Sequence, residues 1–147
     1  MMDLRELYQE TILDHNRNPR NHREILNPTC QARGFNPLCG DKLTVYVNID
    51  NNIIKDLSFL GCGCAISQAS SSLMTETLVG KTVTEAHEIF ERFHHMLTQD
   101  DAVPSTMDKL SVLSGVRVFP ARVKCATLAW HTVEAALKKD ATMVTTE

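Results

Sequence analysis

The fold is decided by residues 41–64, which have the sequence DKLTVYVNIDNNIIKDLSFLGCGC. Every second side chain from Leu43 to Ile49 is apolar, which is the period of a half-buried strand. The segment Asp50-Asn51-Asn52 suits a tight turn, and apolar side chains resume over residues 53–59. The pattern predicts a β-hairpin that ends in a segment rich in glycine and cysteine.

Helices are predicted on the C-terminal side of this hairpin. The apolar period changes to that of a helix after Cys64, and the first such helix ends at Gly80. Residues 82–85 form a capping-box pattern for a second helix, and Pro120 suits the first turn of the last helix. The order of elements is strands first and helices after.

The other segments carry weaker signals. They predict a helix from Asp3 to near Asn16, a loop over 23–38 with at most one short strand near 29–34, a surface loop over 98–109, a short helix over about 110–115 and a frayed tail from about residue 140. Residues 1–147 are therefore expected to form a single α+β domain, in which helices pack on a small antiparallel sheet of about three strands.

The composition is that of a globular protein. Of 147 residues, 43% are hydrophobic and 22% are charged, and the formal net charge is −3. A sequence without a basic patch argues against nucleic acid as a partner. No apolar stretch has membrane-spanning length and no export signal is recognised, so we expect no membrane partner and a cytoplasmic location. In that reducing compartment the five cysteines are expected to be ligands or nucleophiles.

Thiols and one carboxylate occur in three short clusters. The clusters are Cys39-Gly40-Asp41, Cys62-Gly63-Cys64 and Cys125 with its neighbours. Residues two apart in an extended chain project to the same side, so Cys39 should share a side with Asp41. By the same rule Cys62 should share a side with Cys64, and the hairpin brings its far ends together. The clusters predict a soft-metal site; the alternative is that the cysteines are buried as small apolar side chains.

Local charge favours ionised, accessible thiols in these clusters. Cys64 precedes one predicted helix and Cys125 lies in the first turns of another, where the helix dipole favours a thiolate. Arg122 and Lys124 flank Cys125 and act in the same direction. A carboxylate such as Asp41 among thiolates indicates an exchangeable ligand, although an Asp also commonly begins a strand or caps a turn.

Several motifs make the sequence similar to one known family. They are Leu7-Tyr8, Ile12-Leu13-Asp14-His15, Asn18-Pro19-Arg20-Asn21, Pro37-Leu38-Cys39-Gly40-Asp41, residues 61–67, Ala69-Ser70-Ser71-Ser72-Leu73-Met74-Thr75 and Arg122-Val123-Lys124-Cys125-Ala126-Thr127-Leu128-Ala129-Trp130. Over about residues 4–138 the chain resembles the SufU/IscU/NifU N-terminal family of iron–sulfur cluster assembly proteins.

Three features make the SufU branch the closest resemblance. IscU-type members carry a His directly before the last Cys, where this chain has Lys124. They also carry a Leu-Pro-Pro-Val-Lys segment, where this chain has Phe-Pro-Ala-Arg-Val-Lys over residues 119–124. The long segment between Cys64 and Cys125, with the loop at Pro104, is similar to the insertion that distinguishes SufU proteins.

The resemblance implies a SufE/NifU-like fold, a zinc site and a role in sulfur transfer. The zinc ligands that it implies are Cys39, Asp41, Cys64 and Cys125. It further implies that a pyridoxal-phosphate cysteine desulfurase of the SufS or IscS type delivers persulfide sulfur to Cys39, which passes it to a downstream scaffold or to apo-proteins. The chain is then an acceptor rather than a turnover enzyme with a small substrate. Because Cys39 lies on a loop between Pro37 and Gly40, it is the ligand best able to leave the metal.

Other functions stay open beside the zinc-dependent acceptor. With iron or a [2Fe–2S] cluster in place of zinc, the chain would be a scaffold on which a cluster is assembled and transferred. A structural zinc module that mediates protein contacts is a second alternative, although such a site does not need Asp41 or the cations Arg122 and Lys124. A thiol oxidoreductase using Cys62 and Cys64 is disfavoured because the Cys-x-x-Cys motif is missing. Cys62, extra relative to the family, is an alternate ligand, a relay thiol or an ordinary loop residue.

Overall fold

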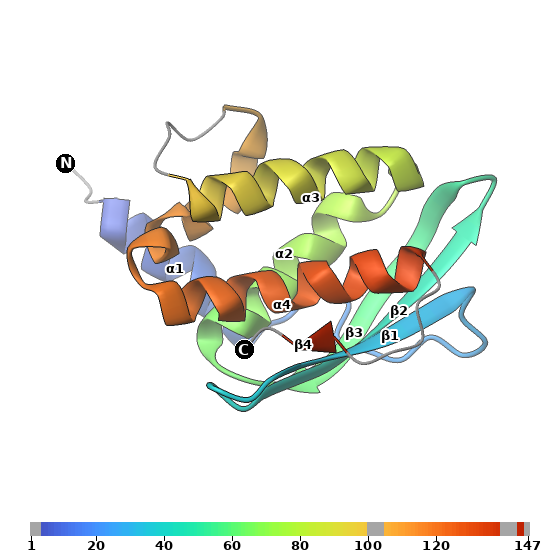
Figure 1. Ribbon diagram of the computed structural model, residues 1–147, viewed down its shortest axis with the longest axis horizontal. Coiled ribbons are helices and arrows are strands. Elements are labelled where there is room, and N and C mark those ends of the chain that lie inside the picture. The colour runs from blue at the N-terminus through green and yellow to red at the C-terminus, as the bar shows by residue number, and fades with distance from the viewer. Residues whose placement is uncertain (1–3, 100–104, 139–143, 146–147) are drawn as a thin grey trace.

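The computed structural model describes residues 4–99, 105–138 and 144–145 and has helices packed on one sheet (Figure 1). The helices are α1 Leu4–Arg17, α2 Ala65–Leu78, α3 Val83–Thr98, the 3-10 helix η1 Ser105–Val118 and α4 Pro120–Leu137. The strands are β1 Cys30–Asn36, β2 Asp41–Asp50, β3 Ile53–Cys62 and β4 Val144–Thr145. Among the described residues, no helix is both long and apolar enough to cross a membrane.

The sheet contains the three antiparallel strands that the sequence predicts. Its strand order is β3-β2-β1-β4, and β4 adds a two-residue parallel pairing to the outer edge of β1. Strand β1 extends beyond the predicted 29–34 segment to Asn36. It does so because alternate residues as far as Asn36 are buried, and Pro37 follows directly. The α+β class is confirmed.

The β2–β3 hairpin turns at two asparagines. Both Asn51 and Asn52 have left-handed backbone angles, with φ of 52° and 62°, which is the pair of conformations that a type I′ turn requires. The strands pair from this turn as far as Lys42 and Cys62. The predicted convergence of the far ends of the hairpin is therefore confirmed.

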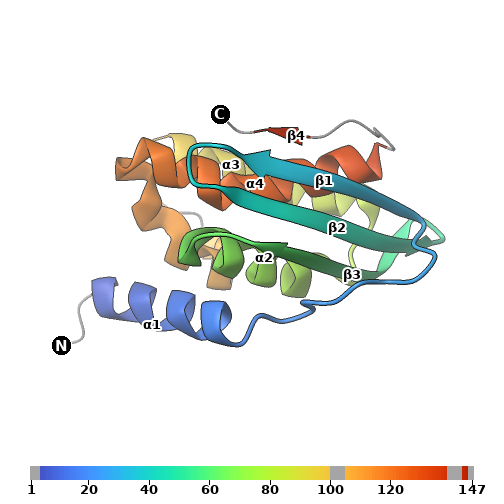
Figure 2. The ribbon, with the colours of Figure 1, turned by 90° about the horizontal axis from the view of Figure 1, so that it is seen from below.

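Helices α2 and α4 cover one face of the sheet, and Figure 2 shows strands β1–β3 in front of them. Helix α4 approaches β1 closely at Gly34, where a Cβ atom would collide with the side chains of Thr132 and Leu128. On α4, the Trp130 ring stacks on Phe93 of α3, with ring centroids 4.4 Å apart. The close contact at Gly34 fixes how deeply the middle of α4 sits against the sheet.

The segment between α3 and α4 differs from the prediction. The sequence predicts a surface loop over 98–109 and a short helix over 110–115, whereas η1 runs from Ser105 to Val118. Apolar side chains at every third position are buried along it: Leu110, Leu113 and Val116. Residues three apart eclipse one another in a 3-10 helix, so this spacing produces a single buried row. Residues 100–104 of the predicted loop lie outside the described residues.

The two ends of the chain follow the predicted elements in part. Helix α1 ends at Arg17, close to the predicted end at Asn16, and its predicted cap Asp3 lies outside the described residues. The predicted fraying of the tail falls mostly on residues 139–143 and 146–147, which also lie outside them. Between these two segments, Val144–Thr145 pairs with β1 as β4.

Helix α1 is anchored to α2 through a buried histidine. His15 is 4% exposed, and its Nδ1 lies 2.7 Å from the hydroxyl of Ser72. The backbone N–H of Arg20 donates to the same hydroxyl at 2.9 Å. The Ser72 hydroxyl therefore joins the His15 ring of α1 and the backbone at Arg20 to α2. Burial, reinforced by the Arg20 guanidinium, lowers the pKa of His15 from its ordinary 6.5.

This anchor predicts a pH-dependent stability. Between the lowered pKa and 6.5, the unfolded chain binds a proton that folded His15 does not, so the free energy of unfolding falls as the pH drops below 6.5. His15→Gln should lose that part of the decline, as measured by urea unfolding at about pH 8 and about pH 5.5. The exposed His95→Gln is the control on α3. Equal declines in wild type and His15→Gln would contradict the assignment.

Candidate metal centre

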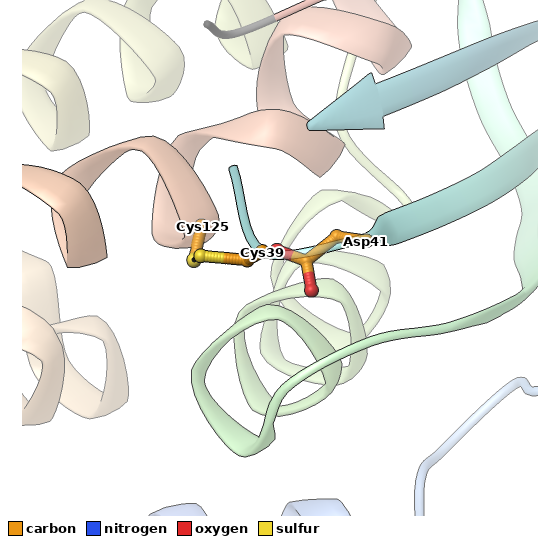
Figure 3. A group of neighbouring side chains, drawn as sticks. All are labelled: Cys39, Asp41 and Cys125. Atoms are coloured by element: carbon orange, nitrogen blue, oxygen red, sulfur yellow. Dashed lines mark hydrogen bonds between the residues drawn. The ribbon is translucent and has the colours of Figure 1, made fainter. Parts of the chain in front are cut away.

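The predicted metal site lies where the β1–β2 turn meets the N-terminal halves of α2 and α4 (Figure 3). Residues 37–40 connect Asn36 to its cross-strand partner Asp41. Gly40 has φ of +71°, a left-handed conformation that lets the chain turn back into β2. This turn places Cys39 beside the start of β2, with its sulfur next to the Cys125 sulfur on α4.

Three of the predicted ligands converge. One ligand atom from each of Cys39, Asp41 and Cys125 lies within 4.8 Å of the other two. The sulfurs of Cys39 and Cys125 are 3.0 Å apart and belong to free cysteines. In Figure 3 the three side chains point toward one another from the turn, from the start of β2 and from α4.

Asp41 joins this group to Cys64. The Asp41 carboxyl is fully buried at 0% exposure, and its Oδ1 accepts the backbone N–H of Cys64 at 2.9 Å. Cys64 is the N-cap residue of α2, so the negative carboxylate lies at the positive end of the helix dipole, which stabilises it. The Cys64 sulfur lies 4.0 Å from Asp41 Oδ2. It is therefore beside the three-residue group, and its service as the fourth ligand stays a prediction.

The arrangement fits a soft divalent cation. Zinc bonds of about 2.3 Å in a tetrahedron put neighbouring ligand atoms about 3.8 Å apart. The Asp41–Cys64 separation of 4.0 Å is close to that value, whereas the two sulfurs at 3.0 Å are closer than it. A fully buried carboxylate facing thiols is unfavourable unless a cation or hydrogen bonds offset its desolvation. Thiolates with one carboxylate are a donor set that suits zinc.

The predicted accessibility of the Cys125 thiol is wrong. The sequence predicts an accessible, ionised thiol, but Cys125 is 1% exposed. Burial raises its pKa well above the ordinary range, and hydrogen bonds with Cys39 and Asp41 raise it further. Desolvation here outweighs the nearby helix N-terminus, because Cys125 faces the core side of β1 rather than the solvent. A bound cation would reverse this balance, since a coordinating thiol loses its proton.

The two cations that flank Cys125 are Arg122 and Lys124, and Arg122 interacts with the thiols of the site. Arg122 is exposed, and interaction with the Cys64 thiol first, then with those of Cys125 and Cys39, raises the pKa of its guanidinium. Arg122 therefore lies beside the site. Lys124 is half-buried on the same turn of α4, and its supporting role stays a prediction.

Cys62 lies away from the converging ligands. It is exposed and pairs directly with Lys42 across the β2–β3 hairpin, so both side chains are on the outer face of the sheet. Asp41 precedes Lys42 and faces the opposite side. The prediction that Cys62 and Cys64 share a side is wrong, because the chain leaves the strand after Cys62 and turns at Gly63 into α2.

One polar residue at the site was not among the predicted ones. Asn36, at the end of β1, is fully buried and donates from Nδ2 to the Cys125 sulfur at 3.6 Å. Its Oδ1 accepts the backbone N–H of Leu38 at 3.2 Å. The available signal is its position: an amide at the core-facing end of a strand, directly before Pro37 and three residues before Cys39.

The fold and this site define a class: a small α+β protein that brings thiols and a carboxylate together in one group that could hold a metal ion. The chain belongs to the family of NifU-like N-terminal domains, which it matches over residues 7–145. It is similar to the zinc-dependent sulfurtransferase SufU of Bacillus subtilis, with 38% identity over 94% of each chain. It is also similar to the iron–sulfur cluster assembly scaffold protein IscU of Thermotoga maritima, with 36% identity over 94% of this chain and 97% of the relative.

A solved structure agrees with this assignment. The putative iron–sulfur cluster assembly scaffold protein for the SUF system from Fervidobacterium islandicum superposes with a TM-score of 0.81 and 36% identity, covering 90% of this chain and 97% of that one. The predicted resemblance to the SufU/IscU/NifU N-terminal family is therefore confirmed.

The ligand assignment predicts which thiols retain zinc. Cys64→Ser and Cys125→Ser should each lower the zinc content of the purified protein from about one ion per chain toward zero, as measured by plasma mass spectrometry. Both variants should also unfold at lower urea concentration, because metal-binding energy is partly folding energy. Cys62→Ser, the matched control on the outer face, should keep its zinc. Full zinc content in Cys64→Ser would remove Cys64 from the ligand set.

The close contact between Gly63 and the Asp41 carboxylate predicts that a side chain at Gly63 weakens zinc binding. A Cβ at Gly63 would lie 2.5 Å from Asp41 Oδ1, so Gly63→Ala should displace the carboxylate and weaken zinc binding in a chelator competition titration. The control is Gly80→Ala, which has open space but φ of +89°. It should lower the free energy of unfolding by about 1–2 kcal/mol and leave zinc affinity unchanged. Wild-type zinc affinity in Gly63→Ala would contradict the role of this close contact.

Proposed function

We propose that the chain is a zinc-dependent acceptor of sulfur in iron–sulfur cluster assembly. Cys39 takes persulfide sulfur from a pyridoxal-phosphate cysteine desulfurase, and the sulfur then passes to a downstream scaffold or to apo-proteins. The zinc is held by Cys39, Asp41, Cys64 and Cys125. One observation carries the proposal: a thiol on a surface turn, Cys39, lies in contact with a buried thiol and within 4.8 Å of a buried carboxylate.

The burial of the proposed ligands supports different roles for them: two that stay on the metal and one that reacts. Asp41 and Cys125 are fully buried, whereas Cys39 is half-buried on the β1–β2 turn. The neighbouring Leu38 is 63% exposed, which gives a partner protein an apolar contact next to the thiol. A partner can therefore approach Cys39 without unpacking α4 or β2.

The transfer needs no oxidant or reductant. The thiolate of Cys39 attacks the terminal sulfur of the desulfurase persulfide, the sulfur–sulfur bond of that persulfide breaks, and the desulfurase cysteine leaves as a thiolate. The terminal sulfur, with its proton, ends as a persulfide on Cys39. When bound, zinc lowers the pKa of thiols in contact with it and so supplies the thiolate form. The Arg122 guanidinium beside the site adds a positive charge that favours the same form.

A scaffold for a [2Fe–2S] cluster is the second candidate function. It is supported by the similarity to the Thermotoga maritima scaffold protein IscU and by the Asp41 carboxylate, which exchanges more easily than a thiolate in a soft site. A structural zinc module is less well supported, because such a site has no need of a half-buried ligand on a surface turn. All three candidate functions require reduced thiols, so we propose that the protein is located in the reducing cytoplasm.

The proposal predicts where sulfur appears. Incubation with a cysteine desulfurase and cysteine should add one sulfur atom to Cys39, as mapped by mass spectrometry of peptides under non-reducing conditions. Cys39→Ser should gain no sulfur, and Cys62→Ser should gain it as the wild type does.

Two other results would contradict the acceptor function in different ways. Sulfur found first on Cys125 or Cys62 would show that the accessible position of Cys39 on the turn does not determine which thiol accepts sulfur. If no thiol gains sulfur while the protein builds a cluster from iron and free sulfide, the scaffold function replaces the acceptor function.

A further inference from the structure

Asn36 connects the two elements that carry the contacting thiols. Its side chain is fully buried at the end of β1, directly across the hairpin from Asp41. The amide Nδ2 donates to the Cys125 sulfur on α4 at 3.6 Å, and Oδ1 accepts the Leu38 N–H of the β1–β2 turn at 3.2 Å. One planar side chain thus spans the gap between the turn and the helix.

The two ends of this amide act on the two thiols in different ways. At Cys125 the contact is with the sulfur itself, and an N–H donated to a thiolate strengthens when the sulfur is ionised. At the turn the contact is with the backbone one residue before Cys39, so it holds the position of the turn and not the Cys39 sulfur. The amide therefore favours Cys125 as a fixed ligand and leaves Cys39 free to react.

The burial of Asn36 supports a specific role over a general structural one. Alternate residues of β1 before it, Ala32 and Gly34, are small and pack against the helical layer. An amide at the next core-facing position is unfavourable unless both of its polar ends are satisfied. Here both ends are satisfied by groups of the metal site.

We propose that Asn36 is a positioning residue, which keeps Cys125 on the metal and holds the β1–β2 turn over the site so that sulfur is accepted by Cys39 and not by Cys125. The selection of Cys39 rests on the proposed acceptor function. The support of the metal ligand does not, because it concerns zinc binding alone.

The first test uses metal alone. Asn36→Ala should raise the zinc dissociation constant by about 10–100-fold, which is the usual effect of removing a hydrogen-bond partner of a metal ligand. In the cobalt-substituted protein, the thiolate-to-cobalt charge-transfer bands should shift, a change that general destabilisation does not produce. Asn36→Leu, which keeps more of the side-chain volume, tests the same loss if Asn36→Ala does not fold.

The matched control removes a second amide from the same sheet. Asn48 on β2 accepts the backbone N–H of Thr29 through Oδ1, as Asn36 accepts that of Leu38. Asn48→Ala should bind zinc and cobalt as the wild type does. Unchanged zinc affinity and an unchanged cobalt spectrum in a folded Asn36 variant would overturn the proposed support of Cys125.

The second test maps sulfur after incubation with desulfurase and cysteine. In Asn36→Ala a part of the sulfur should move from Cys39 to Cys125, because Cys125 is no longer held. Sulfur on Cys39 alone in this variant would overturn the selection role. If wild type itself takes up no sulfur, the acceptor function fails, and the zinc and cobalt measurements still decide whether Asn36 supports Cys125.

Discussion

The hydrogen bond from the Cys64 N–H to the Asp41 carboxylate is the contact on which the metal site depends. It joins the first residue of β2 to the N-cap of α2, two points that are 23 residues apart in the chain. The hairpin register, which brings Lys42 opposite Cys62, makes this contact available, and Gly63 leaves the space for it. Because the carboxylate is fully buried, its position is fixed by this hydrogen bond and by the thiols around it.

The depth of Cys125 is set by a second contact, between α2 and α4. The Ser70 hydroxyl donates to the carbonyl of Ala126, the residue after Cys125, and Trp130 Nε1 donates to the same hydroxyl at 3.1 Å. Together with the close approach of α4 to Gly34, these bonds fix the helix against both the sheet and α2. The position of Cys125 is therefore set by the core packing of α4, whereas the position of Cys39 is set by a turn of four residues.

The sequence predicts the hairpin and the ligand clusters because both depend on short-range patterns. Alternating apolar residues and an Asn-Asn turn specify β2 and β3, and the two-residue spacing of Cys39 and Asp41 puts both on one side where the chain enters β2. Long-range packing decides the rest. The burial of Cys125 follows from how α4 docks. Cys62 and Cys64 lie on different sides because β3 ends at Cys62 and the chain turns at Gly63, which two-residue alternation does not predict. The sequence predicts a loop and a short helix where η1 lies, because only the packed structure buries the apolar residues that recur at every third position.

The site is asymmetric in a way that bears on its chemistry. Ligands held by packed elements lose little freedom when a metal binds, whereas a ligand on a turn gains freedom whenever it leaves. Asp41 and Cys125 are of the first kind, and Cys39 is of the second. A site built wholly from buried ligands would bind metal and do nothing more, and one built wholly from turns would hold it poorly. In the proposed function, a single thiol on a turn against a fixed pair allows the metal to stay while one sulfur takes part in transfer. The Asn36 amide contacts both the turn and α4, so the proposed positioning role falls on this residue.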